Sequence, residues 1–241
     1  MNVEPDRLRR LALTVAYDGA PYAGWQLQPD QPTVQGELER ALALLAGQPV
    51  RIMGSGRTDS GVHALGQVCH LDDPGLPPVA RLPQALNAQL PGAVRVVAAR
   101  AVPPEFHALH SAWRKTYVYQ LHRADVAGGL RAVEAAVPPH RRGTFHAVRA
   151  DLDVEAMRRA AARLVGRHDF MALSKAMPAG RGTVKTVQAV RVLPMARGLR
   201  LIVTGEGFLY GMVRLMAGLL VEVGRGRRRA EDVPALLASR D

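Results

Sequence analysis

A glycine-rich segment, residues 54–64, contains the side chains with the clearest chemical potential in the sequence. Three glycines stand within eight residues around Arg57, Thr58 and Asp59, so the backbone is free to bend sharply and present a carboxylate on a tight turn. The segment lacks the Gly-Lys-Ser/Thr ending of a P-loop, and Asp59 takes the place of the third glycine of a dinucleotide-binding fingerprint. Because Gly, Ser and Asp are also the ordinary composition of a solvated turn, the segment indicates either a functional carboxylate or a plain surface turn.

A single arginine interrupts an apolar stretch near the end of the chain. Arg214 lies within residues 207–224, whose apolar side chains leave no polar stripe, so the pattern predicts a largely buried helix. A buried guanidinium has a large desolvation cost unless a carboxylate pairs with it, and Glu206 and Glu222 lie too near the helix ends to be assured partners. We therefore expect another acid beside Arg214. The alternative is a side chain that reaches solvent or binds a phosphate.

Alternating residues in the segment 115–121 predict a strand with Tyr117, Tyr119 and Leu121 on one face. The spacing alone favours two core tyrosines, and the alternative is that one ring is presented to a nucleic-acid base. The histidines, acids and the single cysteine show no zinc-type spacing, so we expect no metal site. Cys69 lies in an apolar strand-like stretch and is expected to be a core thiol.

The charge balance indicates a polyanionic partner. The net charge is +11, and only three of the 32 basic residues are lysines, so arginine, which suits bidentate phosphate contacts and base stacking, predominates. An arginine-biased genome would explain the choice of arginine but not the excess of cations. Two basic clusters could neutralise phosphates, or could be solvated charge runs that keep the protein soluble. They are Arg141-Arg142 and the group Arg225, Arg227, Arg228 and Arg229.

The elements that position these residues fall into two halves. In the first half we predict strands at residues 11–17, 68–71 and 94–100. One helix should begin after an N-cap at Thr33 and end at Gly47 and Pro49, and another should begin near residue 81. The second half is predicted to contain strands at 115–122, 186–193 and 199–205, the last two joined by a turn at Gly198, and helices at 153–165 and 210–223. Residues 127–148 show no clear period and are expected to be a loop.

Pro103-Pro104 is the best candidate linker, because consecutive prolines neither donate to a strand ladder nor continue a helix. We expect an N-terminal α+β domain at 1–103 that carries the Asp59 loop. The C-terminal α+β domain, 104–241, would then carry the Tyr117 strand and the Arg214 helix.

Length and composition are those of a globular protein. The chain has 241 residues, of which 48% are hydrophobic and 22% are charged, so disordered, collagen-like and disulfide-framework proteins are excluded. The N-terminal apolar stretch is too short for a signal peptide, and no segment is long enough to span a bilayer. We therefore expect a cytoplasmic protein with no membrane partner.

Six sequence blocks, taken in order, resemble the TruA-type tRNA pseudouridine synthases. The most specific is the Arg-Thr-Asp-Ser-Gly-Val-His run at residues 57–63, and the resemblance extends from about Leu11 to Gly224. The blocks are residues 17–26, 56–64, 106–108, 115–119, 166–170 and 208–214. Because such relatives usually continue past the last helices with a short strand, which this chain lacks after Asp241, we expect the C-terminal sheet or dimer surface to differ.

The resemblance implies a fold of two similar RRM-like or ferredoxin-like α+β halves, with antiparallel or mixed sheets, that together form the pseudouridine synthase fold. It also implies one site joining the halves, in which Asp59 is the essential carboxylate, Tyr117 packs against the target base and Arg214 pairs with Asp59. Our own hypothesis for Arg57 is a contact to the phosphate of a flipped nucleotide.

The reaction implied by the resemblance is isomerisation of uridine to pseudouridine at positions 38 to 40 in the anticodon stem-loop of tRNA. A homodimer would perform it without cofactor or metal. The base must detach at N1, rotate and reattach through C5. Asp59 could attack C1′ of the ribose, add to C6 of the base, or help remove the C2′ proton, and the sequence does not choose among these routes.

Two other functions compete with this interpretation. A non-catalytic RNA-binding protein of two RRM-like modules would explain the net charge, but the sequence has no RNP1 match. A binding role also does not explain why Asp59 stands on a glycine-framed turn or why Arg214 stands within an apolar helix. A nucleotide hydrolase that uses Asp59 and a metal ion is the third possibility, and loss of its activity on addition of EDTA would identify it.

Overall fold

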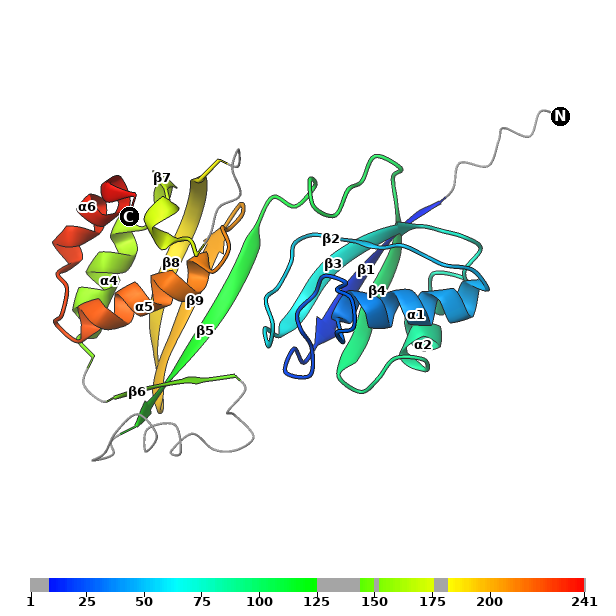
Figure 1. The fold of residues 1–241 in the computed structure, drawn as a ribbon, viewed down its shortest axis with the longest axis horizontal. Helices are drawn as coiled ribbons and strands as arrows, with labels where there is room; N and C mark the ends of the chain where they lie inside the picture. The colour runs from blue at the N-terminus through cyan, green and yellow to red at the C-terminus, as the bar shows by residue number, and fades with distance from the viewer. Residues whose placement is uncertain (1–8, 125–143, 150–151, 176–181, 241) are drawn as a thin grey trace. The chain divides into compact units, whose positions relative to one another are not determined.

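The computed structural model describes residues 9–124, 144–149, 152–175 and 182–240 (Figure 1). The chain divides into two compact units, Met1–Ala112 and Trp113–Asp241. The division falls beyond Pro103-Pro104 because the residues after the prolines remain bound to the first unit. The Arg10 guanidinium donates to the carbonyl oxygens of Pro104 at 2.6 Å and Phe106 at 3.0 Å.

The first unit is a four-stranded antiparallel sheet with two helices on one face (Figure 1). Its strand order is β2-β3-β1-β4. Alternation along β1 buries Leu11, Leu13, Val15 and Tyr17 in the core, as the period-2 pattern predicted. The elements are β1 (Arg10–Tyr17), α1 (Val34–Ala46), β2 (Met53–Gly54), β3 (Ala64–Asp72), α2 (Leu82–Asn87) and β4 (Val94–Val102).

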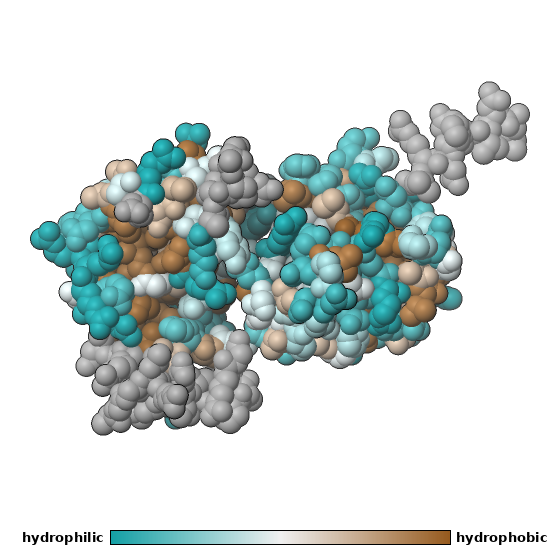
Figure 2. Space-filling model, in the orientation of Figure 1, coloured by the Kyte–Doolittle hydropathy of each residue, from teal (hydrophilic) through white to brown (hydrophobic). Residues whose placement is uncertain are grey.

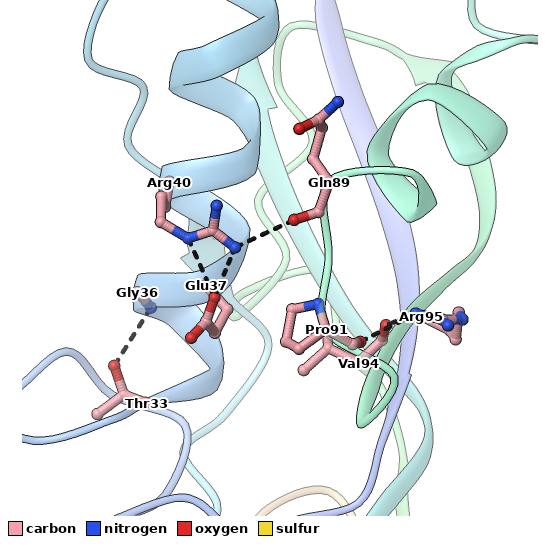
Figure 3. A network of polar contacts seen from close by, with 8 residues as sticks. All are labelled: Thr33, Gly36, Glu37, Arg40, Gln89, Pro91, Val94 and Arg95. Carbon is pink, nitrogen blue, oxygen red and sulfur yellow. Dashed lines mark hydrogen bonds and ion pairs between the residues drawn. The ribbon is translucent and has the colours of Figure 1, made fainter.

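Helix α1 has the predicted boundaries because both caps are present. The Thr33 side chain accepts a hydrogen bond from the Gly36 N–H, and Gly47 ends the helix with a φ of 69°. Arg40 on this helix pairs with Glu37 at 2.9 Å and donates to the Gln89 carbonyl oxygen at 3.0 Å, just beyond α2 (Figure 3). Arg40 therefore adds one polar link between α1 and the residues after α2 to the contacts of the core.

The second unit is a five-stranded mixed sheet with order β6-β5-β9-β8-β7. Strands β5 and β6 run parallel, and the other neighbours run antiparallel. Gly198 makes the predicted turn between β8 and β9 with a φ of 144°. The elements are β5 (Lys115–Ala124), β6 (His146–Arg149), α4 (Val154–Arg163), β7 (Gly166–Asp169), β8 (Val184–Met195), β9 (Gly198–Gly205), α5 (Met212–Gly224) and α6 (Val233–Ser239), with short 3-10 turns at Met171–Leu173 and Ala230–Asp232.

The expectation of a loop over residues 127–148 is wrong at its end. His146–Arg149 forms β6, a four-residue strand that pairs in parallel with the end of β5. So short a strand depends on its partner more than on its own periodicity, and for this reason the pattern did not indicate it. Residues 127–143 lie outside the described residues.

Each unit has its own hydrophobic core, and the predicted α+β fold with one antiparallel and one mixed sheet is confirmed. Cys69 is fully buried in the first core, where burial raises the pKa of its thiol to about 12, so it is the core thiol expected. Within the described part of the chain, no helix is both long enough and apolar enough to cross a bilayer.

Candidate active site

The glycine-rich loop, defined as residues 54–64, connects β2 to β3 in the first unit. Its backbone is bound to the segment that follows β1. The Trp25 N–H donates to the Thr58 carbonyl oxygen at 3.1 Å, and the Gly61 N–H donates to the Tyr22 carbonyl oxygen at 3.3 Å. Two backbone hydrogen bonds thus fix the loop on either side of the carboxylate it carries.

Asp59 is the first residue of the tight turn that the sequence predicted. The Val62 N–H donates to the Asp59 carbonyl oxygen at 3.1 Å and closes the turn. Gly61, the third residue of the turn, has a φ of 76°, whereas Ser60 is not among the residues of positive φ, so the turn is of type II. Glycine adopts this conformation without steric strain, and for this reason a glycine follows Asp59 at this distance.

Close contacts with the backbone of the glycine-rich loop explain two glycines in the segment after β1. A Cβ atom at Gly24, where φ is 115°, would lie 2.7 Å from the Thr58 carbonyl oxygen. A Cβ atom at Gly19 would lie 2.1 Å from the Val62 carbonyl oxygen. The segment after β1 and the glycine-rich loop therefore pack backbone against backbone, and together they hold the turn.

Asp59 and Arg57 differ from the other polar residues of the loop, several of which form local hydrogen bonds through their side chains. Asp59 is half-buried and Arg57 is exposed, and among the described residues neither side chain forms a hydrogen bond or an ion pair. The other acids near the first sheet mostly pair with arginines. Those pairs are Asp72 with Arg10 at 2.8 Å, Asp73 with Arg9 at 2.6 Å and Glu39 with Arg51 at 2.9 Å.

Tyr117 lies on β5 in the second unit, opposite Val203 of β9. Its side chain is half-buried rather than fully in the core, and its ring meets the Phe208 ring edge to face with a centroid separation of 5.2 Å. Phe208 lies in the segment between β9 and α5 and had no predicted role. A contact between residues so distant in the chain gives no periodic signal, although Phe208 stands in a block that carries the family resemblance.

Helix α5 is largely buried, as predicted, but Arg214 is not. Arg214 and Gly218, one turn apart, are its exposed positions. Figure 2 shows hydrophobic residues gathered at the surface of the second unit where α5 runs. The expectation that Arg214 is buried and therefore requires an acid is wrong, because Arg214 lies on an exposed side of the helix and its guanidinium reaches solvent.

Arg214 lies on the side of β5 that carries the tyrosines. Burial raises the pKa of the Tyr119 hydroxyl, and the positive charge of Arg214 opposes this shift. Tyr119 and Tyr117 share one face of β5, because side chains two apart in a strand point the same way. The second unit thus brings Tyr117, Phe208 and Arg214 to one side of its sheet, whereas Asp59 and Arg57 belong to the first unit.

The basic cluster after α5 is partly neutralised by its neighbours. Arg225 and Arg227 lie 3.2 and 3.4 Å from Glu222, and Arg229 lies 3.6 Å from Asp232. These exposed pairs leave the cluster less cationic than its sequence indicates. The other cluster, Arg141-Arg142, lies outside the described residues.

Comparison with known proteins identifies the family. The sequence matches the family described as tRNA pseudouridine synthase over residues 13–110 and 160–241. A protein named tRNA pseudouridine synthase A from Halalkalibacterium halodurans is 44% identical over 234 residues, 97% of this chain and 85% of the relative. Proteins of the same name from Syntrophotalea carbinolica (44% identity; 94% of this chain, 86% of the relative) and Moorella thermoacetica (43% identity; 95% and 90%) are similar. The chain belongs to the tRNA pseudouridine synthase family.

Proposed function

We propose that the protein isomerises uridine to pseudouridine at positions 38 to 40 in the anticodon stem-loop of tRNA. Family membership supports the reaction and the class of substrate. The observation that carries the proposal is the rigid turn that presents the Asp59 carboxylate without a partner among the described residues. In the reaction the N1–C1′ bond breaks, a C5–C1′ bond forms, C5 loses a proton and N1 gains one.

Asp59 is proposed as the essential carboxylate, with Arg214 as its ion-pair partner. Neither side chain has a partner of opposite charge among the described residues of its own unit. Asp59 is half-buried without a cation, and Arg214 is exposed without a carboxylate, among the residues the structure describes. A neighbouring guanidinium would keep the carboxylate ionised once substrate excludes water, because an opposite charge offsets desolvation.

Tyr117 is proposed to pack against the target base and Arg57 to contact the backbone of the same nucleotide. A uridine within the stem-loop has to leave its stack before a carboxylate can reach its ribose or its base. Base–aromatic stacking is worth about 1–3 kcal/mol, which offsets part of that cost. The exposed Arg57 guanidinium, two residues before Asp59, would bind the phosphate and hold the nucleotide outside the stem.

The first experiment is pseudouridine mapping by carbodiimide labelling of an unmodified tRNA pool, with no added metal or cofactor. We expect new pseudouridine in the anticodon stem-loop with the wild-type protein and none with Asp59→Asn, which should still bind tRNA. Asp30→Asn is the matched control, because Asp30 is an exposed acid of the same unit whose φ of 55° asparagine tolerates.

Two outcomes would contradict the proposal. Equal pseudouridine formation by wild type and Asp59→Asn would remove the carboxylate from the reaction. Tight tRNA binding by both proteins without any pseudouridine would favour a non-catalytic RNA-binding protein. An Arg57→Ala variant with unchanged tRNA affinity and turnover would refute the phosphate contact alone.

The protein is further proposed to act as a homodimer. Sedimentation equilibrium of the purified full chain tests this directly, because a dimer has twice the mass of 26.0 kDa calculated for one chain. A monomer that remains fully active at concentrations where no dimer forms would contradict the assembly but not the chemistry.

A further inference from the structure

Two lysines of the second unit lie on the same face and at the same end of its sheet. Lys115, the first residue of β5, is opposite Gly205 of β9, and Gly205 is in turn opposite Val187 of β8. Directly opposed residues of antiparallel strands share a face, and Lys185 shares the face of Val187 because it is two residues away on the same strand. Gly205 has no side chain to separate them.

No carboxylate in the part of the chain that the structure describes pairs with either ammonium group. Both lysines are half-buried, and burial together with the charge of Lys185 lowers the pKa of the Lys115 ammonium. Two close like charges that are partly removed from water destabilise the free protein, and a bound anion would relieve this cost.

An aromatic ring adjoins this pair of cations. Tyr117 follows Lys115 on the same face of β5, and the Phe208 ring that contacts Tyr117 also covers Gly205. A Cβ atom at Gly205 would lie 3.1 Å from Cζ of Phe208. The cations and the ring that is proposed to receive the target base therefore line one end of the sheet.

The choice of lysine is itself informative in this chain. Lys115, Lys175 and Lys185 are the only lysines among 32 basic residues. Lys175 packs against the start of α5, since a Cβ atom at Gly211 would lie 2.8 Å from its Cγ. All three lysines thus lie around the segment that connects β9 to α5. A compact ammonium has a shorter reach and more freedom than the planar fork of arginine, so arginine is not equivalent at this place.

We propose that Lys115 and Lys185 together bind a phosphate of the tRNA backbone beside the Tyr117 ring. The inference rests on the proposed function and adds to it a binding site for the nucleotide chain on the second unit. Both lysines are substrate-binding residues in this proposal, and the phosphate supplies the negative charge that no described side chain supplies.

The test is equilibrium binding of an unmodified tRNA transcript to the full chain over a series of salt concentrations. We expect Lys115→Gln and Lys185→Gln each to weaken binding by about fivefold or more and to make the affinity less dependent on salt. In the double variant, the slope of log affinity against log salt concentration should fall by about the contribution of one phosphate contact. Because both lysines bind one phosphate, the double variant should lose less than the product of the single losses. Lys115→Arg should recover only part of the affinity.

A matched control and a stability measurement separate binding from folding. Arg191→Gln removes one exposed cation from the same strand, but on the opposite face of the sheet, and should leave affinity unchanged. Without RNA, each lysine variant should melt at the wild-type temperature or above it, because one of two repelling charges is gone. A structural role would instead lower the melting temperature and leave tRNA affinity unchanged.

Unchanged affinity and unchanged salt dependence in both single variants would overturn the proposal. This failure is distinguishable from failure of the proposed function, because wild-type binding and pseudouridine formation are measured on the same transcript. If wild type forms pseudouridine while the lysine variants bind tRNA as tightly as it does, only the phosphate site is wrong.

Discussion

The glycine-rich loop of the first unit and the aromatic and cationic cluster of the second are built in opposite ways. Backbone hydrogen bonds and close glycine contacts fix the loop around Asp59. The cluster consists of Lys115 and Tyr117 of β5, Lys185 of β8, Arg214 of α5 and Phe208 of the segment before α5. Sheet register brings the strand residues together, and the ring contact with Tyr117 adds Phe208. The loop therefore positions one carboxylate through its backbone, whereas the cluster brings together side chains from several elements.

The two regions also differ in how their charges are balanced. In the first unit the acids beside the sheet pair with arginines, and Asp59 stands apart from them. In the second unit Lys115, Lys185 and Arg214 are without carboxylate partners among the described residues. The first unit thus presents the carboxylate proposed for the reaction, and the second presents cations that suit a polyanionic substrate.

The largest effect, on the rate of pseudouridine formation, is expected in a double-mutant cycle that combines one variant of the loop with one variant of the cluster. Asp59→Asn and Arg214→Gln should each reduce pseudouridine formation by about 10² to 10⁴-fold, the range for a group that acts on the reacting atoms. If the two residues act as one pair, the double variant should be no slower than the slower single variant. Single-turnover rates on one tRNA transcript measure this. Multiplying rather than saturating losses would show that the two regions act independently.

The rigidity of the loop is tested at Gly24. Gly24→Ala places a Cβ atom 2.7 Å from the Thr58 carbonyl oxygen at a φ of 115°, so the backbone has to move. We expect a loss of about 1–3 kcal/mol in the free energy of unfolding, together with slower turnover, since the turn that carries the carboxylate shifts. Urea denaturation and rate measurements on the same sample check both. Wild-type stability and rate would mean that the loop is adaptable after all.

Gly218 is the opposite case in the second unit. It lies within α5 and is not among the glycines of positive φ. A Cβ atom there would meet nothing within 4 Å. Gly218→Ala should therefore raise the free energy of unfolding by about 0.5–1 kcal/mol, because alanine loses less conformational entropy in a helix. The same urea titration measures this change in the free energy of unfolding. A destabilised variant would show that the exposed side of α5 at Gly218 is packed more closely than its exposure indicates.

The sequence was sufficient where structure is local. Alternation identified β1, and the caps at Thr33 and Gly47 identified α1, because both signals lie within a few residues of the elements they define. The tight turn at Asp59 was predictable for the same reason. The backbone contacts that fix the turn, from Gly19 and Gly24, join segments far apart in the chain, and periodicity does not report them.

Sequence patterns failed where neighbours decide the outcome. Strands β6 and β7 have four residues each and depend on β5 and β8 for their hydrogen bonds. Arg214 was expected to be buried because the helix is apolar on most sides, but Arg214 and Gly218, one turn later, lie on an exposed side of α5. The proximity of Lys115 to Lys185 follows from sheet register, and the contact of Tyr117 with Phe208 depends on the path of the segment after β9. No single segment encodes either one.

The smallest effect should appear at acid pH in the first unit. The hydrogen bond from Arg10 holds the pKa of the Asp72 carboxyl below its ordinary value of 3.8, although burial opposes the shift. A carboxyl whose pKa is lower in the folded state contributes stability above its unfolded pKa and loses it as the pH falls through the folded pKa. Because the Asp72 side chain is 49% exposed, the contribution should stay below about 1 kcal/mol. Asp72→Asn should therefore lower stability slightly at pH 7 and leave it unchanged at a pH below the folded pKa, as followed by urea denaturation. Equal losses at both pH values would show that Asp72 acts through packing rather than charge, and the contrast between paired acids and the unpaired Asp59 would then lose its electrostatic basis.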